Sequence, residues 1–446
     1  MVTPGPTIQN IFQRGVPSGT ATTESITLNV VDAINRALEH NLGLLAAEEL
    51  AGRAKGARWI ALADLLPNVS GRLSETRQKV NLAAFGFPLP PSLGFPEVVG
   101  PFNVFDARIY VSQAVLDFRA LNASRAESHN LAAANYSVKS ARDLVVLAAA
   151  NAYLESLAAS ARADSARAQT ESAQAIFDQA SHMRESGIVA GIDVLRAEVQ
   201  LGLRRQRATA AQNDFDKSKL QLARIIGLPI GQAFTLSDDV PFVPVPEMTL
   251  EEALDRAYKT RPDFLAAQER VRAAEADRQS IVGEMLPAVH VNADFGDIGL
   301  SVDSARGTFS LSGAVTVPIF QGGRSQGRLM QADAALKNRR SEAEDLRAGV
   351  YYEVRGAFLD LQSTAEQLQV ATRGRDLAQQ QLTQARDRFA AGVTNNVEVV
   401  QAQEAVAEAS EQYISALYGY NVAKAMLARS LGVAEDAARQ YLGGVR

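Results

Sequence analysis

The side chains that could carry acid–base or metal chemistry are scattered through this chain of 446 residues. Its four histidines, His40, His129, His182 and His290, lie far apart, and none has a second ligand-type residue at the spacing of a metal site. Carboxylates are numerous, but they stand among Arg and Gln on expected helical faces, where solvation explains them. We therefore predict that the protein is not an enzyme and that it holds no cofactor and no metal.

The glycine-rich stretch FQGGRSQGR, at residues 320–328, invites comparison with a phosphate-binding loop. It matches neither the P-loop nor the dinucleotide-binding fingerprint. Its place between a strand-like and a helical pattern accounts for the glycines by backbone conformation. Neither a hydrolase nucleophile elbow nor a zinc-protease motif occurs. The function must therefore be sought in the elements that the chain forms.

Composition narrows the class of protein. Charged residues make up 21% of the chain and the net charge is −5, which offers no basic face for nucleic acid. The absence of cysteine favours an oxidising compartment. No apolar run reaches the roughly 18 residues of a transmembrane helix. The N-terminal residues show neither the basic nor the apolar region of a signal peptide, so we expect none in this sequence.

The two halves of the chain repeat each other. The opening at Thr27 matches the one at Thr249, and Leu66 matches Leu286, where helical patterns give way to strand-like alternation. From Arg119 onward a constant offset of 205 residues aligns the halves without a gap for more than a hundred residues. Such agreement indicates an internal two-fold duplication.

Each repeat reads as a helix, two strands, a very long helix, a turn and a returning helix. We expect an extended N-terminal segment (1–26), a first repeat (27–227) with a strand pair at 67–117 and a turn at 187–193, a linker (228–248), a second repeat (249–432) with a strand pair at 287–320 and a turn at 392–398, and a C-terminal tail (433–446). The fold class is therefore mainly α with a small β part.

The long helices need an explanation of their own. The stretch from Arg119 to Gly187 contains no proline and carries apolar residues at helical spacing. As one helix it would be about 100 Å long. The returning helix is about half that length, and the helix before the strands would complete it end to end. A coiled coil explains these helices but leaves the strands between them unexplained.

The strand segments, among them FDARIYVSQAV and AVHVNADFG, alternate apolar and polar residues with a period of two. Ile109 and Val111 fall on one face, and Arg108 and Tyr110 on the other. This pattern fits a half-buried sheet of a soluble protein as well as a transmembrane barrel. Four strands cannot close a barrel with a lumen, whereas three chains would supply twelve.

Taken in order, these motifs resemble the TolC-type outer-membrane efflux channel family over about residues 27–432. The resemblance rests on the paired openings at Thr27 and Thr249, the LLPNV and MLPAV motifs before the strands, the VPIFQGGR turn at Val317 and the RFAAGVTNNVEVVQAQ hairpin at Arg388. Each motif is degenerate alone, but together and in duplicate they are specific.

The resemblance implies a homotrimer in the bacterial outer membrane. Each chain would give four strands to a 12-stranded β-barrel and long helices to a periplasmic α-helical tunnel, with the linker 228–248 in an equatorial belt. The channel would be a passive duct of a tripartite efflux or type I secretion system. Many relatives carry a lipidated N-terminal cysteine, which this sequence lacks.

The partners implied by the resemblance are a periplasmic adaptor (membrane fusion) protein, an inner-membrane pump of the RND, ABC or a similar class, and outer-membrane lipid, with no nucleic acid. The exported substrate is not indicated, because the pump usually selects it. The alternative is a non-conducting coiled-coil scaffold or adaptor protein of the cell envelope. Charged substitutions in the strand pairs distinguish the two, since only a lipid-facing barrel would reject them.

The turns between the long and the returning helices are expected at the periplasmic tip of the tunnel. Gly187 and Gly392 allow each helix to end in a left-handed residue. The apolar residues Ile188, Val189 and Val393 beside them suggest a docking surface for the adaptor. Two ordinary helix–helix turns are the alternative.

Asp193 and Glu398 begin the returning helices, where an acid also suits the helix dipole. In the family, acids here line the closed entrance, and Glu398 and Gln401 match the first and second of these positions. Three copies of Glu398 would form a cation-selective ring. The family closes its entrance with a tyrosine and an arginine, which this chain replaces by Phe389 and Thr394. Since Phe389 cannot hydrogen-bond to Asp193, we expect closure by packing.

Overall fold

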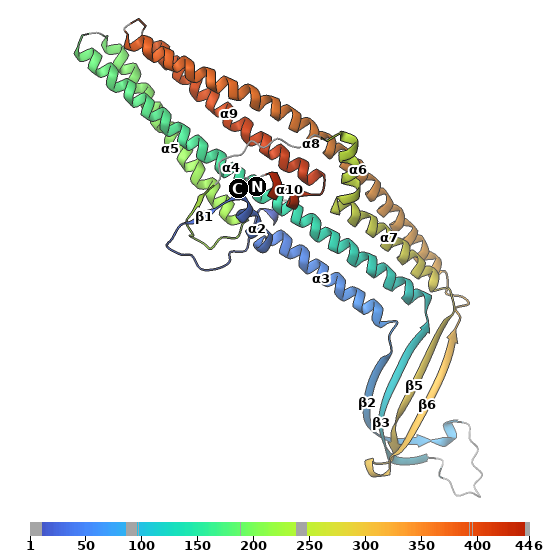
Figure 1. The fold of residues 1–446 in the computed structure, drawn as a ribbon. Helices are drawn as coiled ribbons and strands as arrows, with labels where there is room; N and C mark the ends of the chain where they lie inside the picture. Colours follow the sequence, from blue (N-terminus) through green and yellow to red (C-terminus); the bar gives the residue numbers. More distant parts are fainter. Residues whose placement is uncertain are drawn as a thin grey trace. The chain divides into compact units, whose positions relative to one another are not determined.

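The computed structural model describes residues 11–85, 96, 98–187, 189–237, 248–391, 393–394 and 396–441. It confirms a mainly helical chain with a small β part (Figure 1). The chain forms two compact units. The helical unit comprises Met1–Leu50, Ala134–Ala266 and Glu344–Arg446, and the sheet unit comprises Ala51–Ala133 and Ala267–Ala343. Each unit therefore takes parts from both halves of the sequence.

The elements follow one another in nearly the same order twice. The first series is β1 (Ile26–Leu28), α2 (Val30–His40), α3 (Leu42–Ala63), β2 (Asn68–Asn81), η1 (Leu82–Phe85), β3 (Val98–Leu116), α4 (Phe118–Glu185) and α5 (Gly191–Ile225). The second is β4 (Phe234–Leu236), α6 (Leu250–Thr260), α7 (Pro262–Gly283), β5 (Ala288–Gly299), η3 (Val302–Ser304), β6 (Arg306–Thr316), α8 (Arg324–Ala390) and α9 (Asn396–Ser430), followed by α10 (Ala434–Tyr441).

Four details differ from the sequence-based expectation. The single helix expected before each strand pair is two helices, α2 and α3 in the first repeat and α6 and α7 in the second. The returning helices α5 and α9 begin inside the predicted turns, so each turn is shorter than the sequence pattern indicated. The expected C-terminal tail contains the helix α10, which packs against α9. The short strands β1 and β4 form a separate parallel pair within the helical unit.

The first helix of each repeat starts at a capping box. Asn29 accepts a hydrogen bond from the N–H of Asp32 at 2.7 Å, and Thr249 accepts one from the N–H of Glu252 at 3.2 Å. In both cases the acid's carboxylate in turn accepts from the N–H of the capping residue. Because these side chains satisfy backbone donors that lack a partner within the helix, they define where α2 and α6 begin.

A single extended residue separates α2 from α3 and α6 from α7, and in both places it is buried. Asn41 donates from Nδ2 to the carbonyl oxygen of Phe12 at 2.7 Å. Arg261 donates from Nε to Asp263 at 3.0 Å and from Nη1 to Glu353 at 2.7 Å. Polar side chains buried in this way must be hydrogen-bonded, and here they hold the helix breaks in place.

The largest apolar cluster of the helical unit surrounds the middle of α4. Val145, Ala149 and Tyr153 are fully buried there, and the hydroxyl of Tyr153 donates to the carbonyl oxygen of Leu28 at 3.0 Å. The same stretch makes α4 the one described helix that is long and apolar enough to cross a membrane, a feature that the sequence analysis did not find. Because 61% of that apolar window is buried, its place in this core explains its composition.

The sheet unit contains four antiparallel strands in the order β2-β3-β5-β6, so β2 and β6 are its edges. The register places like residues in rows across the strands. Ile109 lies opposite Phe295, and Phe295 lies opposite Phe309. The neighbouring row is polar, with Tyr110 opposite Asp294. Since paired residues share a face, one face of the sheet is apolar and the other polar.

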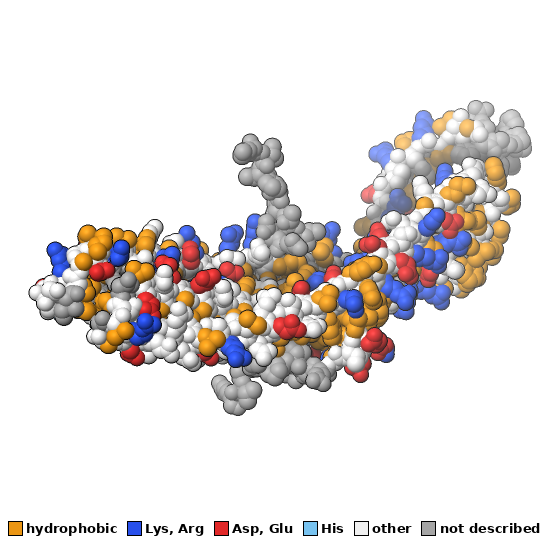
Figure 2. All heavy atoms as spheres, turned by 90° about the horizontal axis from the view of Figure 1, so that it is seen from above, with side chains coloured by type: hydrophobic (Ala, Val, Ile, Leu, Met, Phe, Trp, Pro, Cys, Tyr) orange, Lys and Arg blue, Asp and Glu red, His pale blue; other side chains and the backbone are white. Residues whose placement is uncertain are grey.

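The apolar face is exposed, as is the polar face along the edge strands β2 and β6. The side chains of Phe309 and Leu311 are 80% and 73% exposed, and Val69, Leu73, Ile109, Phe295 and Val315 are also exposed. Hydrophobic side chains accordingly gather on the surface of the sheet unit, at the right of Figure 2. This is the reverse of a soluble sheet, which turns its apolar face inward.

The polar face instead carries a network around Arg108. Its guanidinium contacts Asp294 at 2.6 Å, Asp106 at 3.0 Å and Thr308 at 3.2 Å, and the side chains of Arg108 and Asp294 are each only 18% exposed. A Cβ atom at Gly296 would lie 2.7 Å from Cγ of Arg108 and closer still to the neighbouring backbone. Glycine is therefore required at this position, because any side chain would collide with the backbone of β3 at Ala107 and Arg108.

Burial also shifts the pKa values of Lys424 and Asp143 in the helical unit. Burial lowers the pKa of Lys424 in α9 to about 8, although its Nζ lies 3.4 Å from Oδ1 of Asn421 and 5.5 Å from the ring centre of Tyr420. Burial also raises the pKa of Asp143 to about 6, opposed by the nearby charge of Arg429. Both shifts show that desolvation of the charged form outweighs the attraction of its neighbours.

We predict that Lys424→Met flattens the alkaline pH dependence of stability. The folded pKa lies below the value of the unfolded chain, so the unfolded chain binds more protons between about pH 8 and 10.5, and stability rises with pH across that range. Thermal melting of purified wild type at pH 7.5 and 9.5 should show this rise, and Lys424→Met should lose it. Lys337→Met, at an exposed lysine of α8, is the control and should behave like wild type. A rise that persists in Lys424→Met contradicts the assignment.

Candidate functional site

Each of the two turns that end the long helices is closed by a backbone hydrogen bond. Gly187 has a φ of +72°, in the left-handed region that glycine adopts readily, and its N–H donates to the carbonyl oxygen of Arg184 at 2.9 Å. In the second turn the N–H of Val393 donates to the carbonyl oxygen of Arg388 at 3.0 Å. Both hydrogen bonds satisfy carbonyl groups that the helix end leaves without a partner.

The apolar residues of the turns are only partly available to a partner. Val393 is 69% exposed, whereas Val189 is half-buried. Ile188 and Gly392, which were predicted to belong to the same surface, lie outside the described residues. Val393 is therefore the clearest exposed apolar side chain at this end of the helical unit that the structure describes.

Each long helix and its returning helix form a hairpin, α4 with α5 and α8 with α9. Next to the turns, these two hairpins pack together through one apolar cluster. It is formed by buried side chains of α4, α5, α8 and α9, namely Ile176, Ala180, Val194, Ala197, Ala385, Phe389, Val399 and Ala402. Phe389 is the largest of them and is almost completely buried. This residue thus contributes packing between the hairpins, which agrees with the expectation that it makes no hydrogen bond there.

Glu398 lies at the third position of α9 and is held by its own hairpin. Its Oε1 accepts from Arg388 at 2.9 Å, and its Oε2 accepts a short hydrogen bond from the hydroxyl of Thr394. The structure therefore brings Glu398 and Thr394 together, which the sequence analysis did not foresee. This turn is therefore held by hydrogen bonds as well as by apolar packing. Thr394 takes part through its hydroxyl group, although it carries no charge.

Asp193 lies at the equivalent position of α5, and its Oδ1 accepts from Arg196 at 3.3 Å, one turn further along the same helix. Gln401, the remaining residue of the predicted entrance, is exposed on α9. The sequence analysis named the two acids but missed both arginines. Arg196 could have been found from its i,i+3 spacing to Asp193. Arg388 could not, because its pairing depends on the conformation of the turn.

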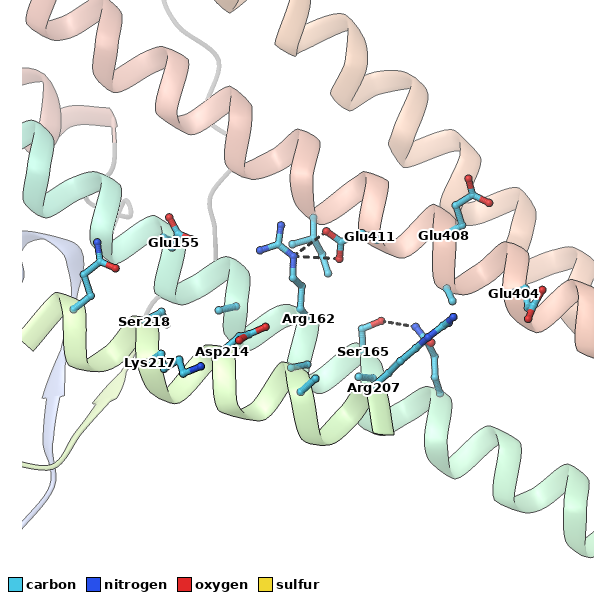
Figure 3. A pocket seen from close by; sticks show the side chains of 18 residues that line it. Glu155, Arg162, Ser165, Arg207, Asp214, Lys217, Ser218, Glu404, Glu408 and Glu411 are labelled. Carbon is cyan, nitrogen blue, oxygen red and sulfur yellow. Dashed lines mark hydrogen bonds and ion pairs between the residues drawn. The ribbon is translucent and has the colours of Figure 1, made fainter. Parts of the chain in front are cut away.

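An open groove of about 880 Å³ is lined by α4, α5 and α9 (Figure 3). Its α9 wall carries Glu404, Glu408 and Glu411, and its α5 wall carries Arg207, Asp214 and Lys217. Arg162 of α4 reaches across it, with Nε donating to Glu411 at 2.9 Å. Sequence reasoning did not find this groove, since its walls come from both repeats.

Metal binding and phosphate binding were the two kinds of chemistry that the sequence raised. Among the described residues, no group of three or more His, Cys, Asp or Glu side chains could hold a metal ion. In the glycine-rich stretch after β6, Gly322 and Gly323 have φ values of +63° and +80°, so they form the turn into α8. This placement gives these glycines the conformational role that the sequence predicted.

Comparison with known proteins gives a consistent result. A family model described as outer membrane efflux protein matches residues 33–228 and 253–433. The pyoverdine export outer membrane protein OpmQ of Pseudomonas putida is 24% identical, with 90% of this chain and 84% of the relative covered. The alkaline protease secretion protein AprF of Pseudomonas aeruginosa is 21% identical, with coverages of 93% and 86%. The fold resembles the MtrE outer membrane channel of Neisseria gonorrhoeae in its open state, with a TM-score of 0.76, 17% identity and coverages of 94% and 95%.

We predict that Phe389→Ala loosens the turns. Removing a buried phenyl group lowers stability by about 3–5 kcal/mol. Because the cluster joins the two hairpins, we expect the variant to open locally more often at the turns. Limited proteolysis should cut near residues 187 and 392 much faster than in wild type. Val393→Ala truncates an exposed side chain and should leave the cleavage rate unchanged. Equal rates in Phe389→Ala and wild type would contradict the packing role.

Proposed function

The chain belongs to the outer membrane efflux protein family, and from that premise we propose that it is the outer-membrane channel of a tripartite efflux or type I secretion system. In this function the protein is a passive duct from the periplasm to the exterior, and no enzymatic step is required of it. The observation that carries the proposal is the exposed apolar face of the four-stranded sheet.

The exposed face supports insertion into lipid. Large apolar side chains such as Phe309 and Leu311, two residues apart on β6, would be costly in water, whereas hydrocarbon accommodates them. The polar face, with Arg108 and Asp294 paired at 2.6 Å, would then line a hydrated interior. A coiled-coil scaffold has no use for such a sheet, so the duct is the better explanation.

The two edge strands support assembly with other copies. Unpaired backbone groups on β2 and β6 cannot remain exposed to hydrocarbon, and four strands are too few to close around a lumen. Pairing of β2 with β6 of the next chain would satisfy both edges. With three copies, as the family resemblance implies, the barrel has twelve strands, and the helical units would continue as a tunnel into the periplasm.

The helix turns support a contact with a periplasmic adaptor, which would join the channel to an inner-membrane pump. Val393 is exposed there, and Val189 lies half-buried in the other turn. The predicted surface of Gly187, Ile188, Val189, Gly392 and Val393 would be repeated around the rim of the trimer. Two relatives are named for pyoverdine export and for alkaline protease secretion. We propose that the cargo of this chain depends on the pump with which it assembles.

We predict that Leu311→Arg prevents stable assembly in the outer membrane. An arginine on the lipid face near the middle of the bilayer costs about 2–4 kcal/mol per copy. Outer-membrane fractions should then contain less heat-resistant oligomer than wild type. Ser312→Arg places the same side chain on the opposite face of β6 and is the matched control. Equal loss in both variants would show that the apolar face does not contact lipid.

We also predict that Val393→Arg weakens adaptor binding, because a charge replaces the exposed apolar side chain at the turn. Site-specific cross-linking between channel and adaptor should fall several-fold while the oligomer stays intact. Val370→Arg is the matched control, since Val370 also lies in the α8 hairpin and is 72% exposed. Undiminished cross-linking in Val393→Arg would remove this residue from the docking surface.

A further inference from the structure

In each turn, the acid near the start of the returning helix forms an ion pair with an arginine, but the arginine comes from a different helix in the two turns. Asp193 and Glu398 occupy equivalent positions of the duplication, 205 residues apart, and each pairs with an arginine of its own hairpin. In the first turn the arginine is Arg196, on the returning helix α5. In the second it is Arg388, on the outgoing helix α8. The partner has therefore changed helices between the repeats.

The alignment shows that neither repeat carries both arginines. At the offset of 205, Arg196 corresponds to Gln401, and Arg388 corresponds to Met183. Arg184, on the outgoing helix of the first repeat, is one residue away from the position equivalent to Arg388, and the ion pair of Asp193 is with Arg196. The constant feature of both turns is thus an acid near the helix start with one arginine beside it, whichever helix supplies the arginine.

Stability alone does not explain these pairs. The side chains of Arg388 and Glu398 are 56% and 35% exposed, and ion pairs at such sites contribute roughly 0–1 kcal/mol. Their effect on the local field is larger. A lone carboxylate at the mouth of a channel attracts cations, whereas a carboxylate with a guanidinium at 2.9 Å presents a dipole and no net charge.

We propose that Arg388 sets the ion selectivity of the channel entrance by neutralising Glu398. The inference rests on the proposed function, because it places three copies of this turn around one opening. It revises the expectation drawn from Glu398 alone: the ring carries three ion pairs in place of three free carboxylates. The entrance then admits anionic and cationic solutes alike, and the pump is left to choose between them.

The test is the reversal potential of purified channels in planar bilayers under a KCl gradient. Wild type should discriminate little between K⁺ and Cl⁻. Arg388→Gln frees the carboxylates and should shift the reversal potential toward that of K⁺, with a several-fold rise in the permeability ratio. Glu398→Gln should shift it toward that of Cl⁻, and the double variant should return it close to the wild-type value.

The duplication itself supplies a rescue experiment. Adding Gln401→Arg to Arg388→Gln places the arginine where the first repeat has it, and wild-type selectivity should return. Arg388→Lys keeps the charge and should resemble wild type. If Arg388→Gln forms channels with an unchanged reversal potential, or if the rescue fails in conducting channels, the inference is overturned. Absence of conductance in the wild type would instead count against the proposed function.

Discussion

The sheet unit imposes the strongest constraint on this protein, since its four strands turn an apolar face outward and leave two edges open. Exposure of the apolar face to water is unfavourable, and so is exposure of the unpaired backbone groups of the edge strands to hydrocarbon. The sheet of a single chain is therefore unsuited to either solvent. Insertion in lipid together with strand pairing between copies removes both difficulties at once. The network around Arg108 fits the same scheme, because it gathers the charged groups on the face that would remain hydrated.

The helical unit shows how a duplicated chain preserves geometry while its chemistry diverges. Both repeats begin a helix with a capping box and interrupt it eleven residues later with one extended, buried residue. That residue is an asparagine bound to backbone in the first repeat and an arginine bound to two carboxylates in the second. Equivalent places in the fold therefore need a satisfied polar group, and different residue types meet that need.

Local patterns in the sequence were sufficient to predict the long and returning helices, the four strands of the sheet and the alternation of their faces, because each depends on residues a few positions apart. They did not predict α10 or the break between α2 and α3. Contacts between distant segments were not predictable in this way. Arg388 meets Glu398 only because the turn brings them together, and Arg261 meets Glu353 across 92 residues. The apolar composition of α4 likewise could be explained only by its burial in the core of the helical unit, which involves segments far apart in the sequence.

The inequality of the two repeats has a consequence for how such a channel can change over time. In a trimer of duplicated chains, six hairpins surround the opening, but they are encoded as two kinds that alternate. A single mutation therefore alters every second hairpin and leaves the three between them as they were. A ring of six identical subunits would have to accept each change at all six places together. The alternation lets one set of hairpins acquire a new property while the other set retains the old one.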